Sequence, residues 1–76
     1  MTGNRMRDVE ITEEPVELYK ILKFEGLVAS GAQAKSVIEE GLVRVNGEVE
    51  TRKRKKMLSG DIIEFADERL RLQLKA

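Results

Sequence analysis

The stretch from Ser30 to Gly47, SGAQAKSVIEEGLVRVNG, constrains the fold most, because it combines signals for a helix start, a helix end and a tight turn. Ser30 is a favoured N-cap, and Gln33 can reach back to the Ser30 backbone N–H to form a capping box. Gly41 can end the helix in the left-handed conformation. Asn46-Gly47 is a strong hairpin signal. The stretch therefore predicts a short helix that leads directly into a β-hairpin.

The register of this hairpin depends on the length of its loop. A two-residue turn would set Arg44 opposite Val49 and mix apolar and charged partners on each face. A three-residue loop with Gly47 in the left-handed conformation would instead pair Val43 with Val49 and Arg44 with Glu48, so that each face is uniform. We expect the three-residue loop.

The remaining patterns predict one α+β domain over residues 8–76, with two short N-terminal helices packed on a small, mostly antiparallel β-sheet. Residues 1–7 have no periodicity and are expected to form a flexible tail, and residues 8–12 alternate as a short edge strand does. The first helix is expected to begin at Thr12 or Glu14, with Pro15 in its first turn. Its expected apolar stripe is Leu18, Ile21, Leu22 and Phe24. Later strands are expected at 48–58, 62–65 and 70–74, with a turn at 59–61.

Composition argues against several classes of function. The 76 residues contain neither cysteine nor histidine, which argues against disulfides, Cys or His zinc sites and histidine acid–base chemistry. No apolar run approaches the roughly 20 residues of a membrane span. We therefore expect a cytoplasmic, monomeric protein with no membrane partner, no small-molecule substrate, no metal and no cofactor.

The charge is unevenly distributed along the chain. Fourteen Lys and Arg balance fourteen Asp and Glu, but five of the bases are consecutive at positions 52–56. Screening acts over about 8 Å at physiological salt, so a phosphate at this block would respond to the local charge. A solvated run that protects a strand edge is an alternative explanation.

Taken together, these motifs resemble the RNA-binding domain named after small-subunit ribosomal protein S4, also called the αL motif. The pattern looks like the small stand-alone bacterial branch typified by YbcJ, and it covers nearly everything from Ile11 to Phe65. The matching residues are Ser30, Ala34, Lys35, Ile38, Glu39, Glu40, Gly41, Val43, Arg44, Val45, Asn46, Gly47, Gly60, Asp61, Ile62 and Ile63, together with segments 22–23, 31–35 and 50–54.

The resemblance implies binding to the phosphate backbone of structured RNA, of the ribosomal or transfer RNA class. The expected RNA-binding residues are Lys23, Gly31, Ala32, Lys35, Arg44, Arg52, Lys53, Arg54 and Lys55. Many relatives carry arginines where this chain has Gly31 and Ala32. Lys23, Lys35 and the basic block are therefore expected to make more of the phosphate contacts. Two expected residues have structural alternatives, because Lys35 could pair with Glu39 at i,i+4 and Arg44 could pair with a cross-strand Glu48.

Few aromatic residues are available for stacking on bases. Tyr19, Phe24 and Phe65 all fit core positions, which favours structured RNA over base-specific binding to a single strand. The resemblance also implies that the chain is not an enzyme, since relatives that modify RNA carry a separate catalytic domain. An alternative function is a protein-interaction adaptor, for example a partner of the ribosome or of ribosome-assembly proteins.

Overall fold

A five-stranded sheet, two short helices and a two-stranded ribbon make up the computed structural model, which describes residues 5–75. The elements are β1 (Arg5–Ile11), β2 (Val16–Glu17), α1 (Leu18–Phe24), α2 (Gly31–Glu39), β3 (Val43–Val45), β4 (Glu48–Val49), β5 (Lys56–Met57), β6 (Ile62–Phe65) and β7 (Glu68–Leu74). The large sheet has the strand order β1-β7-β6-β3-β4, and β2 pairs with β5. The α+β class is confirmed.

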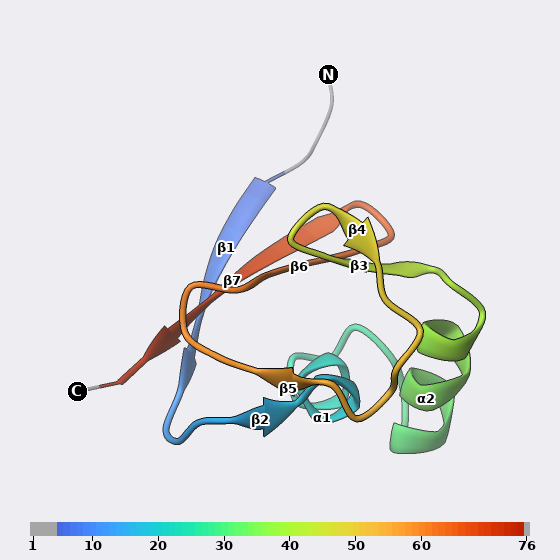
Figure 1. Ribbon diagram of the computed structural model, residues 1–76, viewed down its shortest axis with the longest axis horizontal. Helices are drawn as coiled ribbons and strands as arrows, with labels where there is room; N and C mark the ends of the chain where they lie inside the picture. Colours follow the sequence, from blue (N-terminus) through green and yellow to red (C-terminus); the bar gives the residue numbers. More distant parts are fainter. Residues whose placement is uncertain (1–4, 76) are drawn as a thin grey trace.

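All strand pairs are antiparallel except β1 and β7, which run parallel at one edge of the large sheet. Both helices and the β2–β5 ribbon lie together on one side of this sheet (Figure 1). The core between them contains fourteen buried apolar residues, and Leu18, Leu22, Ile38, Met57, Ile63, Leu70 and Leu72 have no exposed surface. The helices are too short to be stable alone, so this shared core holds them in place.

The helix α2 begins and ends close to the expected residues. The Gln33 backbone N–H donates to Ser30 Oγ at 3.1 Å. The Gln33 side chain closes the cap by accepting from the Ala29 backbone N–H at 2.8 Å, one residue earlier than a strict capping box requires. Gly41, just beyond the C-cap, has φ +80°, a conformation that glycine adopts at little cost.

The expected register of the β3–β4 hairpin is wrong. Arg44 pairs with Val49, and Val45 pairs with Glu48, across a two-residue turn. Asn46 and Gly47 have φ values of 53° and 87°, so both adopt the left-handed conformation that this tight turn requires. Both residues of β4 are exposed at the edge of the sheet, so a mixed face costs little there.

The start of the first helix is also later than expected. Pro15 precedes β2, and α1 begins only at Leu18. Leu18, Ile21 and Leu22 are buried as expected, but the Phe24 side chain is 70% exposed. At the N-terminus, β1 already includes residues 5–7, where a flexible tail was expected, while residues 1–4 of that expected tail lie outside the described residues.

The basic block does not form the expected strand. Only Lys56 and Met57 form β5, and residues 50–55 are an irregular loop, called the basic loop below. The Leu18 backbone N–H donates to the Lys55 carbonyl at 2.9 Å, and that of Tyr19 donates to the Lys53 carbonyl at 3.1 Å. The N-cap Glu17 makes no side-chain cap bond. The basic loop therefore supplies acceptors for N–H groups that a helix start leaves without intrahelical partners.

Candidate functional site

The ring of Tyr19 brings two cations from different elements together. Lys35 Nζ of α2 lies over this ring, 4.7 Å from its centroid, and the Arg54 guanidinium carbon of the basic loop lies 5.5 Å from the same centroid. Both distances are within the range of cation–π attraction. Tyr19 itself is partly buried and packs against the hydrophobic core, which holds its ring in position. This Tyr19 cluster (Tyr19, Lys35 and Arg54) joins two basic segments that are separate in the sequence.

The first turn of α2 lies beside the Tyr19 cluster. A Cβ atom added at Gly31 would lie 3.8 Å from the Tyr19 ring and 3.9 Å from Lys23 Cδ, both ordinary contact distances. Lys23 of α1 therefore reaches the start of α2, where the helix dipole favours an anion. Ala32, in the same turn, is exposed and adds no charge. Lys23, Lys35 and Arg54 thus converge on one surface.

Three cations of the basic loop pair with acids within the protein, and the ion pairs of Arg52 and Lys53 are the two shortest. Arg52 Nε lies 2.9 Å from Glu50 Oε2, and a second guanidinium nitrogen donates to Glu50 Oε1 at 3.1 Å. Lys53 Nζ lies 2.9 Å from Glu39 Oε2, which ties the loop to α2. An incoming phosphate would have to compete with these carboxylates, so Arg52 and Lys53 are less available than Lys35, which takes part in no ion pair within residues 5–75.

A shallow hollow of about 440 Å³ lies beside the loop, lined by Arg52, Arg54, Lys55 and Lys56. Arg54 also lies 3.5 Å from Glu17 Oε1, and Glu17 lies 3.6 Å from Lys20 Nζ. Within residues 5–75, no ion pair involves Lys55 or Lys56. In the described part of the chain, the hollow therefore adds two unpaired ammonium groups to the surface.

The Glu50–Arg52 pair changes the pKa of the Glu50 carboxyl group. The side-chain hydrogen bond from Arg52 lowers the pKa of Glu50 from 4.5 to about 2, with smaller contributions from the Arg52 backbone N–H and the charges of Arg52 and Lys55. Desolvation opposes this lowering of the pKa. Because the folded-state pKa is depressed, the stabilisation is complete above the unfolded value and is lost as the pH falls from 4.5 towards 2.

We expect Arg52→Ala to return the pKa of Glu50 most of the way to 4.5, because it removes the largest cause of the lowered pKa. The pKa is measured by following the Glu50 side-chain carboxyl carbon by NMR during an acid titration. Lys55→Ala is the control, since it removes only the smallest contribution and should raise the pKa much less. Equal pKa changes in the two variants would contradict a specific Glu50–Arg52 bond.

Arg44 does not join the other expected residues. Its guanidinium donates to the Gly47 carbonyl at 3.3 Å on the β3–β4 hairpin. Neither alternative ion pair forms, because Glu48 lies across from Val45, and Glu39, the alternative partner of Lys35, binds Lys53.

Sequence reasoning missed two residues of this surface. Tyr19 was expected only in the core, and Lys56 was not among the expected RNA-binding residues. The i,i+4 spacing of Tyr19 and Lys23 along α1 was the available signal for Tyr19, because residues at this spacing lie on the same face of a helix.

The described residues contain neither a metal-binding cluster nor a membrane-spanning helix. Within 5–75, no group of three or more acids could hold a metal ion. In the same range, no helix is long and apolar enough to cross a bilayer. The arrangement offers instead a surface of exposed cations that can donate hydrogen bonds to oxyanions.

Comparisons with known proteins agree with the resemblance in the sequence. The family model for the S4 domain matches residues 9–73. A protein of Escherichia coli (strain K12), YbcJ, named as a candidate RNA-binding protein, is 57% identical over 51 residues, which cover 67% of this chain and 73% of the relative. YbcJ of Shigella flexneri, named as an uncharacterised protein, matches to the same extent.

A solved structure matches the fold as well. The solution structure of E. coli YbcJ, described as revealing an αL motif involved in RNA binding, superposes with a TM-score of 0.68. The two sequences are 45% identical over this superposition, which covers 90% of this chain and 87% of the other. Two helices on a mostly antiparallel sheet are therefore shared with YbcJ.

Proposed function

This chain belongs to the S4 domain family, and from that premise we propose that it is a non-enzymatic module that binds the phosphate backbone of structured RNA. The observation that carries the proposal is the Tyr19 cluster, in which Lys35 of α2 and Arg54 of the basic loop lie over one ring. RNA is the partner that the name of E. coli YbcJ indicates for that relative. The first turn of α2, Lys23 and the hollow of the basic loop extend the proposed surface.

Backbone recognition fits this surface better than stacking on bases. The Tyr19 ring is already covered by two cations, so a base could stack on it only by displacing one of them. Lysine and arginine instead match the charge of phosphates, and double-stranded RNA is recognised mainly through its shape, phosphates and 2′-hydroxyls. We propose ribosomal or transfer RNA as the class, and with it a cytoplasmic location.

The proposal is tested by fluorescence anisotropy of two labelled RNAs of equal length, a hairpin and an unstructured single strand, each across a salt series. We expect tighter binding to the hairpin, with an affinity that falls by about 0.7–0.9 log units per log unit of salt for each phosphate contacted. Weak, salt-insensitive binding to both RNAs would contradict the proposal. A protein partner that survives nuclease treatment would then favour the adaptor.

Tyr19 is expected to act as a positioning residue for the two cations. Tyr19→Leu removes the ring and with it both cation–π contacts. Each contact is worth about 0.5–1 kcal/mol, so hairpin binding should weaken by about tenfold. Tyr19→Phe keeps the ring and should bind as the unaltered chain does. Anisotropy measures both affinities, and urea unfolding checks that the variants are folded. A similar loss of affinity in Tyr19→Phe would assign the effect to the hydroxyl group instead.

A further inference from the structure

An open groove continues from the proposed RNA surface along α1. It has a volume of about 720 Å³ and is lined mainly by residues of α1, of β2 and of the C-terminal half of β1. Val9, Ile11 and Ile21 form its apolar floor, and each is at most 7% exposed. Tyr19 and Lys23, which belong to the proposed RNA surface, also line it. An RNA strand that leaves the Tyr19 cluster along α1 would therefore enter this groove.

Phe24, at the C-terminal end of α1, gives the groove an exposed aromatic ring. It is 70% exposed, the largest fraction among the large apolar side chains that are exposed in residues 5–75. In this part of the chain, both cations that lie over an aromatic ring lie over Tyr19. A base can therefore stack on Phe24 without displacing a side chain, which the Tyr19 ring does not allow. Exposed aromatic rings are a common platform for the unpaired bases of RNA.

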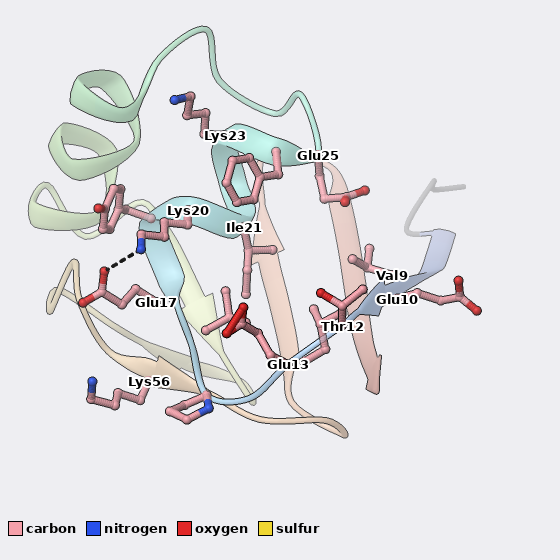
Figure 2. Close-up of a pocket in the computed structure, with 15 residues that line it drawn as sticks. Val9, Glu10, Thr12, Glu13, Glu17, Lys20, Ile21, Lys23, Glu25 and Lys56 are labelled. Atoms are coloured by element: carbon pink, nitrogen blue, oxygen red, sulfur yellow. Dashed lines mark ion pairs between the residues drawn. The ribbon is translucent and has the colours of Figure 1, made fainter. Parts of the chain in front are cut away.

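Three of the acids at the groove add little negative charge to it. Glu10 alternates with buried residues of β1, and Figure 2 shows its side chain directed away from the groove. Glu17 Oε1 lies 3.6 Å from Lys20 Nζ, a pair that the same figure marks with a dashed line. Glu25 Oε1 lies 4.0 Å from a guanidinium nitrogen of Arg7. The two acids that do face the groove are thus each paired with a cation.

Two unpaired cations and one unpaired acid remain in the groove. The acid is Glu13 and the cations are Lys23 and Lys56, and none of the three takes part in an ion pair within residues 5–75. A purely apolar ligand would remove water from these ammonium groups without giving them a partner. A nucleotide supplies both a flat base for Phe24 and a phosphate for Lys23, which directly precedes Phe24 in the chain.

We propose that the groove binds one unpaired nucleotide of a structured RNA, with its base stacked on Phe24 and its phosphate paired with Lys23. This binding mode rests on the proposed function, because the Tyr19 cluster holds the double-stranded stem of the same RNA. Phe24 lies about 7.5 Å beyond Tyr19 along the helix axis, so the unpaired nucleotide adjoins the stem. Bases within a duplex stack on their neighbours, so only a bulged or overhanging nucleotide offers its base to Phe24.

The test is fluorescence anisotropy with labelled RNA hairpins that share one stem. One hairpin is blunt, a second set has a single adenosine bulged at successive positions, and a third set has an adenosine overhang at the 3′ or the 5′ end. The unaltered chain should bind at least one unpaired form about fivefold or more tighter than the blunt hairpin, the smallest effect expected for one stacked base. The form that binds most tightly identifies a bulge or a strand end as the source of the nucleotide. Equal affinity for all the hairpins would overturn the proposal.

Two variants and one altered RNA separate stacking from other effects of an unpaired nucleotide. Phe24→Leu keeps an apolar side chain but removes the ring, so it should abolish the advantage of the unpaired nucleotide and leave binding to the blunt hairpin unchanged. Phe24→Trp keeps an aromatic ring and should retain the advantage. An abasic nucleotide in place of the adenosine should bind the unaltered chain only as tightly as the blunt hairpin does. An advantage that survives Phe24→Leu or the abasic nucleotide would contradict stacking on Phe24.

Two controls separate the nucleotide site from the RNA surface and from other occupants of the groove. Changing Lys35 and Arg54 to glutamine should weaken binding to every hairpin by a similar factor and leave the advantage unchanged. If the unaltered chain bound none of the hairpins, the proposed function and the nucleotide site would both be wrong, whereas binding to the blunt hairpin without any advantage would overturn the nucleotide site alone. A dimer in sedimentation velocity that Phe24→Leu separates would show that a second copy of the chain occupies the groove instead.

Discussion

Replacing Lys35, Arg54 and Lys55 together with glutamine is expected to weaken binding to an RNA hairpin by about a hundredfold at low salt. Hydrogen bonds to charged groups contribute about 1.5–3 kcal/mol each when well formed, and we assume about 1 kcal/mol for each exposed side chain. The slope of log affinity against log salt should become shallower by about 0.7–0.9 for each phosphate that the variant no longer neutralises. Anisotropy across a salt series measures both quantities in one experiment.

The matched control for this variant is the replacement of Arg7, Arg71 and Lys75 with glutamine, which changes the net charge by the same amount. Arg7 is in β1, Arg71 is in β7, and Lys75 directly follows β7. The C-terminal end of β7 lies on the opposite side of the molecule from α2 (Figure 1). Their exposed ion pairs contribute little to stability. Equal decreases of affinity in the two triple variants would show that RNA responds to net charge, and the proposed surface would be wrong.

The parts of the fold that local chemistry determines could be predicted from the sequence. Ser30, Gln33 and Gly41 mark the bounds of α2 through bonds that span only a few residues. The hairpin turn lies at Asn46-Gly47 as predicted, but its register differs, because the prediction assumed that each face of β4 had to be uniform. That assumption holds where a strand is half-buried, and β4 is an exposed edge strand of two residues.

The two aromatic residues of α1 show where periodicity alone was insufficient. At about 100° per residue, Tyr19 and Phe24 lie about 110° to either side of the centre of the Leu18–Ile21–Leu22 stripe. Both residues lie at the edges of this apolar stripe, so the elements packed beside α1 decide whether each side chain is buried. Cations from the basic loop and from α2 lie over the Tyr19 ring, whereas Phe24, at the end of the helix, has 70% of its side chain exposed.

The backbone conformation of the basic block could not be predicted from its own residues. Alternation along a strand would have divided its side chains between two faces, but the block folds as a loop whose carbonyls accept from Leu18 and Tyr19, more than thirty positions away in the chain. This long-range pairing, together with the Lys53–Glu39 ion pair, places Arg54 over Tyr19. Sequence reasoning therefore identified most of the cations of the candidate site but not the residue that gathers them.

Leu22→Ala is expected to destabilise the protein by about 2–5 kcal/mol, because it removes a side chain with no exposed surface from the core. A domain of this size is expected to have a free energy of unfolding of roughly 4–11 kcal/mol, so the destabilisation would be a large fraction of the total. Leu42→Ala makes the same chemical change at a side chain that is 53% exposed and should cost less than about 0.5 kcal/mol.

Urea unfolding followed by circular dichroism measures both leucine variants. The midpoint should fall strongly for Leu22→Ala alone, with an unchanged dependence of the free energy on urea concentration. Since Leu22 is part of the helix that carries Tyr19, hairpin binding by this variant should weaken only at temperatures where the domain begins to unfold. Equal midpoints for the two variants would contradict the burial of the α1 stripe against the sheet, and with it the fixed position of Tyr19 on which the proposed RNA surface depends.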